Sequence, residues 1–384
     1  MKRHILCINS GSSSLKFALY NMGRGEELLA KGAIERIGLK GGICWIDCSG
    51  KKRIQKADFK NHNIAIDRMF VELKALRLPV PDAVGHRIVH GGKSYCKPAV
   101  VDNKLVKTLN GLIPFAPLHL PSEIVCVESV EKRFPKLKQV ACFDTAFHRN
   151  MPEVAKRFPL PEYLHKEGVE RYGFHGLSYE YIVSCIDVRK YSRVIIAHLG
   201  NGASLAAVKS GKSIDTTMGF TPAGGFMMGT RPGDLDPGIL IYLINQKGMS
   251  GKGIERLIND QSGLLGVSGL SSDMKTLLEK SGKNAKAALA IDMFCYQLKK
   301  EIGGFSAALG GVDLLVFTGG IGERAALVRS IVCKGLKYLG IELDEKKNKK
   351  HAEVISTNKS SFPVRVIPTN EDLIIARHTH RLIK

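Results

Sequence analysis

Glycine-bearing turns beside small hydroxyl residues are the features of this chain that could do chemistry. Residues 9–13 read Asn-Ser-Gly-Ser-Ser, residues 200–202 read Gly-Asn-Gly, and residues 318–323 read Thr-Gly-Gly-Ile-Gly-Glu. Glycine lets backbone amides approach phosphate oxygens closely, so each turn could hold a phosphate or a nucleotide. Lys16, just beyond the first turn, could point at a phosphate or remain solvated. Because the Walker spacing G-x-x-x-x-G-K-[ST] and the Rossmann fingerprint are both missing, any such site must be of another kind.

Arginine and histidine residues recur in glycine-rich segments, where we expect loops. The segments are residues 86–92, 172–176 and 228–234, and they carry Arg87 and Arg231. Loop arginines suit bidentate binding of phosphate or carboxylate. The chain offers no cysteine or serine nucleophile constellation, so phosphoryl transfer fits better than acyl or hydride transfer. The residues alone therefore indicate a kinase or an ATPase with a basic cleft between two related domains.

Two strand-turn-strand units must position these turns. An apolar run at residues 5–8 enters the first turn and leaves as residues 14–18, and the layout recurs at residues 194–197 and 204–207. Each unit is typical of a β-hairpin. The repeat predicts two similar α/β domains facing one another, with ligands bound between them.

Helical apolar spacing fills the intervals between the strands, at residues 64–76, 239–245, 285–309 and 327–339. Asp236 can cap a helix whose first residue is Pro237. The last helix is expected to begin near residues 370–372, where two acidic residues suit a helix amino terminus. No long linker is evident, so we expect the chain to cross directly from one domain to the other.

Composition narrows the class of protein. The 384 residues and 44% hydrophobic content allow two cores, and the net charge of +21 favours a polyanion such as nucleic acid, an anionic membrane or a phosphorylated substrate. The densest lysine run, residues 346–350, has no aromatic residues and is expected to be a solvated face. Nine cysteines without a C-x-x-C pair argue against a disulfide framework or a zinc site. With no signal peptide and no apolar stretch of about 18 residues, we expect a cytoplasmic protein.

Six motifs together resemble the acetate kinase (acetokinase) family. They are residues 9–16, 86–92, 143–148, 172–176, 198–202 and 228–231, and the resemblance runs in family order from residue 5 to residue 376. It implies an α/β fold of the acetate and sugar kinase/Hsc70/actin superfamily: two duplicated actin-like, ribonuclease H-like domains with a nucleotide cleft between them. It also implies a first domain, on the acetate and phosphate side, formed by residues 1–143 and the C-terminal helix 373–384. Residues 144–372 would form the second, nucleotide-binding domain.

The activity implied by the resemblance is reversible, direct in-line phosphoryl transfer from ATP to acetate, giving acetyl phosphate and ADP. Mg²⁺ or, in its place, Mn²⁺ would assist, and the enzyme would be a homodimer without nucleic-acid or membrane partners. Two alternatives stay open. One is a kinase for propionate or another short-chain carboxylate, because pocket width cannot be read from sequence. The other is a basic nucleic-acid-binding protein that retains the fold.

The resemblance also assigns residues to roles. Catalysis would involve Arg87, Asp144, His175 and Arg231. The carboxylate substrate would contact Arg87, Val89, Leu118, His119, Phe174 and Pro222. The nucleotide would contact Lys16, His198, Leu199, Gly200, Asn201, Gly202, Asp273, Met274, Lys275, Gly320, Ile321, Gly322, Glu323 and Arg324. Asn9 and Glu371 would be the metal ligands.

Asp144 is the presumed acid or base of the family that the chain resembles, but acetate is already ionised near neutral pH and requires no general base. We therefore expect Asp144 to position magnesium-bound water or Arg87. The chain departs from the family's usual pattern at four positions. Residues 222–225 read Pro-Ala-Gly-Gly instead of Pro-Leu-Glu-Gly, and Leu120 and Arg324 stand where the family usually has Asn. The departures within residues 222–225 and at Arg324 leave acyl-chain preference and nucleotide affinity open.

Overall fold

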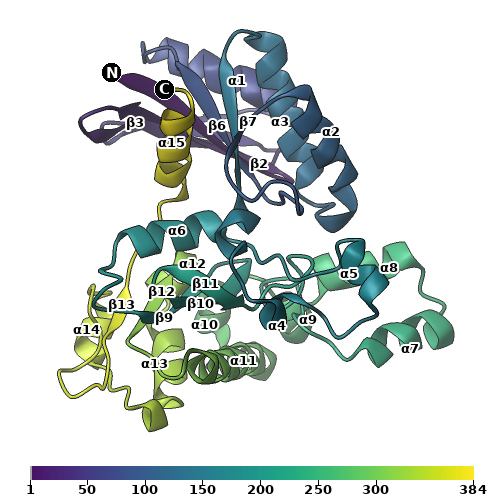
Figure 1. Ribbon diagram of the computed structural model, residues 1–384, viewed down its shortest axis with the longest axis vertical. Helices are drawn as coiled ribbons and strands as arrows, with labels where there is room; N and C mark the ends of the chain where they lie inside the picture. The colour runs from purple at the N-terminus through teal and green to yellow at the C-terminus, as the bar shows by residue number, and fades with distance from the viewer. Residues whose placement is uncertain (1) are drawn as a thin grey trace. The chain divides into compact units, whose positions relative to one another are not determined.

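The computed structural model describes residues 2–384, which form two compact units (Figure 1). Unit 1 comprises the chain up to Phe147 together with residues 370–384, and unit 2 comprises residues 148–369. The C-terminal segment therefore belongs to the same unit as the N-terminal strands. No helix within residues 2–384 has the length and apolar character needed to span a bilayer.

Unit 1 is built on an eight-stranded mixed sheet with the order β5-β4-β3-β2-β1-β6-β8-β7. Strands β1 to β5 are antiparallel neighbours, whereas β6 runs parallel to β1 and β8 runs parallel to β6. The strands are β1 (Arg3–Gly11), β2 (Ser14–Met22), β3 (Glu26–Glu35), β4 (Ile43–Cys48), β5 (Lys51–Lys56), β6 (Ala83–Ile88), β7 (Ala99–Val100) and β8 (Lys138–Phe143). The first expected hairpin is thus confirmed as β1–β2.

The helices of unit 1 cover this sheet. They are α1 (His62–Ala75), α2 (Asn103–Gly111), α3 (Leu120–Arg133) and α15 (Glu371–Leu382). Helices α1 and α3 pack together, and their residues Met69 and Val130 share a buried cluster with Phe17 of β2. Helix α15, yellow in Figure 1, returns to lie against β1, β2, β6 and β8. A Cβ on Gly85 would lie 2.3 Å from Thr379 Oγ1, so β6 needs a glycine where α15 crosses it.

Unit 2 repeats the strand arrangement of unit 1. Its sheet has the order β11-β10-β9-β12-β13, with β9, β10 and β11 antiparallel and β12 and β13 parallel to β9. The strands are β9 (Arg193–Leu199), β10 (Ala203–Lys209), β11 (Lys212–Thr216), β12 (Leu314–Thr318) and β13 (Val364–Val366). The order matches β3-β2-β1-β6-β8, so the duplication expected from the two hairpins is confirmed.

The helices of unit 2 include those expected at residues 239–245 and 285–309, whereas the helix expected at residues 327–339 ends at Lys334 and a 3₁₀ turn follows at Lys337–Leu339. They are α4 (Glu153–Lys156), α5 (Glu162–Lys166), α6 (Gly176–Ser184), α7 (Pro237–Lys247), α8 (Gly251–Arg256), α9 (Gly263–Ser268), α10 (Met274–Lys280), α11 (Ala285–Leu309), α12 (Gly319–Arg324), α13 (Ala326–Lys334) and α14 (Glu345–Lys349). The Asp236 cap is confirmed, because its side chain accepts from the backbone N–H of Gly238. The last helix likewise begins where expected, with Asn370 as its cap.

Two local expectations were wrong. His86 and Arg87 lie in strand β6 and not in a loop, because they pair with Ala141 and Cys142 of β8, and the glycines of residues 86–92 come only after the strand has ended. The turn expected at residues 318–323 is instead helical from Gly319 onward. There the carboxylate of Glu323 accepts from the N–H of Gly319 at 3.1 Å, which stabilises the helix start despite the poor helix propensity of glycine.

Candidate functional site

Arg87 is the centre of a charged cluster in unit 1. Its guanidinium donates to both carboxylate oxygens of Asp144, with Nη2 to Oδ2 the shortest contact at 2.6 Å, and Nη1 donates to Asn9 Oδ1 at 3.1 Å. Its Nε also lies 3.9 Å from Glu371 Oε2. Asn9 lies near the end of β1, Arg87 near the end of β6 and Asp144 directly after β8, so the carboxyl ends of three neighbouring parallel strands bring these side chains together. Glu371 joins them from the first turn of α15.

The electrostatics of this cluster favour permanent charge. Burial disfavours the guanidinium ion, but Asp144 and Glu371 outweigh it and raise the pKa of Arg87. Asp144 is fully buried, so its charge depends on the bidentate contact with the arginine. The cluster can therefore present a fixed cation to an anionic ligand while holding two further oxygen ligands nearby.

Asn9 and Glu371 form a donor set suited to a hard cation. Both supply oxygen atoms and both are half-buried. Among residues 2–384, no group of three or more His, Cys, Asp or Glu side chains could hold a metal ion. Two protein oxygens without a full cage fit Mg²⁺, which usually keeps several waters and bridges phosphates. Lys16 lies opposite Asn9 in the β1–β2 register and is exposed.

The other expected residues of unit 1 lie around the end of β6. Val89 follows the strand and is buried, whereas Leu118 and His119 lie just before α3 and are half-buried. The N–H of Val89 donates to Glu123 Oε2 on α3 at 3.0 Å. Glu123 was not among the expected site residues, because a glutamate in an amphipathic helix usually faces solvent.

A second cluster forms in unit 2 around the β9–β10 turn. A Cβ on Gly202 would lie 3.4 Å from both Arg231 Nη2 and His175 Nε2, so the two cationic groups converge on this glycine. His175 has a left-handed backbone (φ 57°) directly before α6, and its Nδ1 lies 2.8 Å from Ser204 Oγ. Arg231 Nη1 donates to the carbonyl of Pro222 at 2.7 Å. Three residues expected to act near the substrate are therefore neighbours within unit 2.

Two histidines of this cluster are stacked and individually anchored. The rings of His175 and His198 lie 4.3 Å apart between centroids, with an interplanar angle of 23°. His198 Nδ1 lies 2.8 Å from Ser178 Oγ, which also contacts Thr369 Oγ1 at 2.9 Å. Ser178, Ser204 and Thr369 carry no sequence signal that would have identified them as anchors.

The remaining expected nucleotide residues lie on three elements of unit 2. Residues 198–202 form the end of β9 and the turn before β10, Gly320 and Arg324 lie on α12, and residues 273–275 form the start of α10. The Asp273 carboxylate accepts from backbone N–H groups of that helix, and its contacts with Thr276 lower its pKa. Glu323 bridges the N–H groups of Gly319 and Thr369 at 3.1 and 3.3 Å. The carboxylates of Asp273 and Glu323 therefore stabilise the local backbone by accepting hydrogen bonds from it.

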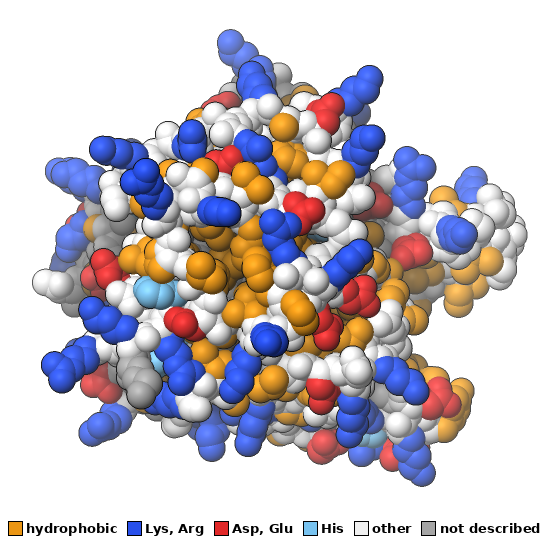
Figure 2. All heavy atoms as spheres, turned by 90° about the horizontal axis from the view of Figure 1, so that it is seen from above, with side chains coloured by type: hydrophobic (Ala, Val, Ile, Leu, Met, Phe, Trp, Pro, Cys, Tyr) orange, Lys and Arg blue, Asp and Glu red, His pale blue; other side chains and the backbone are white. Residues whose placement is uncertain are grey.

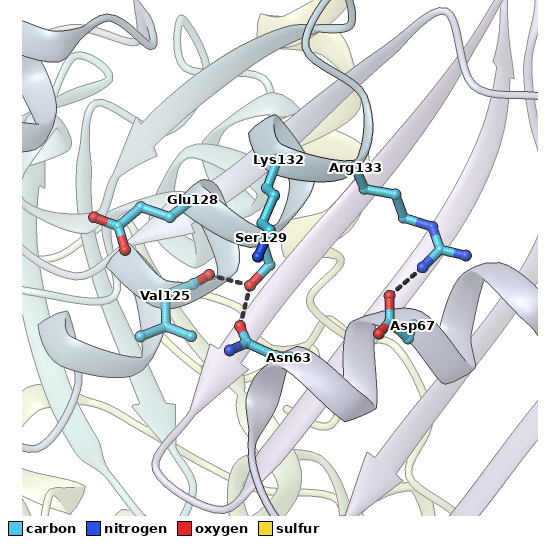
Figure 3. Close-up of a pocket in the computed structure, with 7 residues that line it drawn as sticks. All are labelled: Asn63, Asp67, Val125, Glu128, Ser129, Lys132 and Arg133. Atoms are coloured by element: carbon cyan, nitrogen blue, oxygen red, sulfur yellow. Dashed lines mark hydrogen bonds and ion pairs between the residues drawn. The ribbon is translucent and has the colours of Figure 1, made fainter.

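A separate depression of about 500 Å³ lies between α1 and α3 (Figure 3). Its lining side chains pair with one another: Arg133 with Asp67, and Ser129 with Asn63. It contains none of the residues expected to contact substrate. We therefore do not assign it to the functional site.

Comparison with known proteins identifies the family. A sequence profile of the acetokinase family matches residues 4–377. The chain belongs to the acetokinase family. An acetate kinase from Clostridium botulinum (strain Alaska E43 / Type E3) is 44% identical over 400 residues, covering 99% of this chain and all of that protein. An acetate kinase from Carboxydothermus hydrogenoformans is likewise 44% identical, with 99% of each chain covered.

Solved acetokinase structures agree with the fold. The Porphyromonas gingivalis acetate kinase covers the whole of both chains at 41% identity with a TM-score of 0.89. A propionate kinase from Francisella tularensis covers 99% of both chains at 37% identity with a TM-score of 0.92. The family and the duplicated α/β fold expected from the sequence are confirmed.

This acetokinase family member carries a formal net charge of +21. On the face shown in Figure 2, Lys and Arg side chains are scattered, with Asp and Glu between them. The lysine run is confirmed as solvated, since Lys346, Lys347, Lys349 and Lys350 are all exposed. A depression of about 780 Å³ in unit 1 does gather Lys2, Arg3, Arg24, His380 and Lys384. This depression is a reason to include polyanion binding in a functional test.

Proposed function

We propose that this protein catalyses reversible phosphoryl transfer from ATP to acetate, giving acetyl phosphate and ADP. The observation that carries the proposal is that a family match over residues 4–377 coincides with the clustering of Arg87, Asp144, Asn9 and Glu371. ATP and ADP use follows from the family. Propionate is the alternative acceptor, supported by the likeness to the Francisella tularensis propionate kinase.

The proposed roles follow from how charge develops in the reaction. In-line transfer spreads negative charge over the equatorial oxygens of the moving phosphoryl group, and cations fixed beside it lower the barrier. Arg87 binds the carboxylate substrate, while Arg231 and His175 stabilise the phosphoryl charge. The anchoring of His175 by Ser204 and of Arg231 by Pro222 supports this, because fixed groups need not reorganise during the reaction.

Asn9 and Glu371 are proposed to hold Mg²⁺, or Mn²⁺ in its place. When bound, the ion neutralises phosphate charge. Asp144 is proposed to orient Arg87 and the water around the ion and not to act as a base, because acetate is already an anion. Its bidentate contact with Arg87 and its complete burial support this positioning role.

The experiment is an ADP-release assay on the purified protein with Mg²⁺, ATP and a series of acetate, propionate and butyrate. We expect acetate-dependent turnover with the highest kcat/KM for acetate. Arg231→Met should lower kcat by about 10³-fold or more, whereas Arg189→Met, an exposed arginine in the same unit, should match the wild type. A higher kcat/KM for propionate than for acetate would replace acetate with propionate as the proposed substrate. Salt-sensitive binding of duplex DNA without turnover would favour the nucleic-acid-binding alternative.

A homodimer in the cytoplasm is also proposed. Helix α7 has no buried residue, and Ile239, Ile241, Tyr242 and Ile244 are exposed on it. An apolar helix without a partner is costly in water, so a second copy of the chain is its proposed cover. Sedimentation should show a dimer that Ile241→Glu weakens, and a wild-type monomer at micromolar concentration would contradict it. The division into an acetate-side domain (residues 1–143 and 373–384) and a nucleotide domain (residues 144–372) stays a prediction.

A further inference from the structure

Glu123 is a buried carboxyl group that the proposed chemistry does not use. It lies on α3 and is 1% exposed. Its Oε2 accepts from the N–H of Val89 at 3.0 Å. Its Oε1 is buried without a hydrogen-bond partner among the described residues. A buried polar atom without a partner is costly, so this position needs a physical explanation.

The contact with Val89 replaces sheet hydrogen bonding where strand β6 ends. The pairing of β6 with β1 stops at His86 and its pairing with β8 stops at Ile88. Val89 is 2% exposed, so its N–H would be a buried donor without a partner if Glu123 were absent. Glu123 therefore fixes the backbone two residues beyond Arg87.

The neutral form of Glu123 suits this environment better than the anion. A buried carboxylate with one hydrogen bond lacks the compensation that its charge requires. Burial raises the pKa of Glu123 to about 8, with Asp144 adding to the shift while Arg87 and the Val89 N–H oppose it. Cys126, one turn along α3, is the other titratable group that interacts with it, and burial raises the pKa of that thiol to about 12. Around neutral pH the strand end is thus held by a neutral acid.

We propose that Glu123 is a positioning residue for the carboxylate substrate: its neutral carboxyl group fixes the backbone at Val89, and its ionisation adds negative charge beside Arg87. The proposal rests on the proposed function, because it assigns Arg87 to carboxylate binding. The consequence is an alkaline limit on acetate binding that is built into α3. Arg87 itself keeps its charge throughout, because Asp144 and Glu371 outweigh its burial and raise its pKa.

The test compares the KM for acetate in the wild type and in Glu123→Gln between pH 6.5 and 9.5. Glutamine keeps a carbonyl oxygen for Val89 but cannot ionise. In the wild type the KM for acetate should rise about threefold to tenfold between pH 7 and 9, the size expected for one added charge near the binding arginine. In Glu123→Gln it should change less than about twofold, and the KM for ATP should respond equally in both proteins.

Two further variants separate positioning from general damage. Glu128→Gln changes an exposed glutamate on the same helix and should follow the wild-type curve. Glu123→Asp keeps an acid but shortens its reach, so its KM for acetate should be raised at every pH. Parallel wild-type and Glu123→Gln curves would overturn the inference while leaving the proposed function intact. A wild type without acetate-dependent turnover would instead overturn the proposed function.

Discussion

Replacing Arg329 should test whether this buried arginine stabilises helix α12, which carries residues expected to contact the nucleotide. Arg329 lies on α13 and is fully buried. Its guanidinium donates to the carbonyls of Gly322 and Glu323 on α12, to Asn348 Oδ1 and O, and to His351 Nδ1, at 2.7 to 3.0 Å. All five acceptors are neutral. Burial therefore lowers the pKa of Arg329, to about 10, yet the group is still charged at pH 7.

The magnitude follows from the acceptors that Arg329→Met leaves behind. Three of the five bonds, to Gly322 O and to both acceptors of Asn348, are buried. Each unsatisfied buried acceptor costs about 1–3 kcal/mol. If each of the three costs about 1–2 kcal/mol, the lower half of that range, together they cost about 3–6 kcal/mol. Removing the buried cation offsets part of this cost, so a loss of about 3 kcal/mol is expected. The lysine of Arg329→Lys has three donors, so the free energy of unfolding of this variant should lie between those of Arg329→Met and the wild type.

Urea unfolding followed by circular dichroism measures the loss, with Lys334→Met as the control. Lys334 is exposed on the same helix, so its replacement should change the free energy of unfolding by less than about 0.5 kcal/mol. Arg329→Lys should also raise the KM for ATP, because α12 carries Gly320 and Arg324, which are expected to contact the nucleotide. A loss below about 1 kcal/mol for Arg329→Met would refute the reasoning, since the neutral acceptors would then be satisfied without the guanidinium.

Three further outcomes are expected. Because the pKa of Glu123 rises from 4.5 unfolded to about 8 folded, its stabilising effect is complete below pH 4.5 and is lost as pH rises to about 8. For each pH unit in that window, the free energy of unfolding of the wild type, measured in urea, should fall by about 1.4 kcal/mol relative to that of Glu123→Gln. A difference between the two proteins that does not change with pH would contradict the shifted pKa. Asp144→Asn should raise the magnesium concentration needed for half-maximal rate more than it moves the pH profile; a shift in the pH profile alone would show that Asp144 is a base. Ser204→Ala removes the partner of His175 Nδ1 and should lower kcat about five- to tenfold with little change in the KM for acetate, and an unchanged kcat would remove Ser204 from the positioning of His175.

Local patterns were sufficient to predict the elements that carry their own signals. Apolar runs around short glycine turns predicted both hairpins, and the duplication followed from their similar layout. Asp236 and Pro237 predicted a helix start because capping acts over three residues. Contacts between distant segments could not be predicted in this way. Gly91 and Gly92 suggested a loop over residues 86–92, but residues 86–88 complete strand β6 by pairing with residues 141–143 of β8.

The same limit applies to the candidate site. Arg87, Asp144 and Glu371 were named from family resemblance, and their meeting depends on parallel strand pairing that no local pattern encodes. Glu123 and Arg329 gave no signal at all, because a charged residue between apolar neighbours in a helix is most often on the surface. Their roles emerge only from burial and from the backbone groups that they satisfy.

The discontinuity of unit 1 has a consequence for synthesis on the ribosome. Unit 2 is one uninterrupted stretch, residues 148–369, and its strands can pair as soon as they leave the exit tunnel. The N-terminal strands must wait, because the helix that covers β1 and β6 is translated last. Until Ile375 and Thr379 of α15 pack against Gly85 of β6, that face of the unit 1 sheet stays exposed to water and to chaperones. The first strands to be made are thus among the last to be completed.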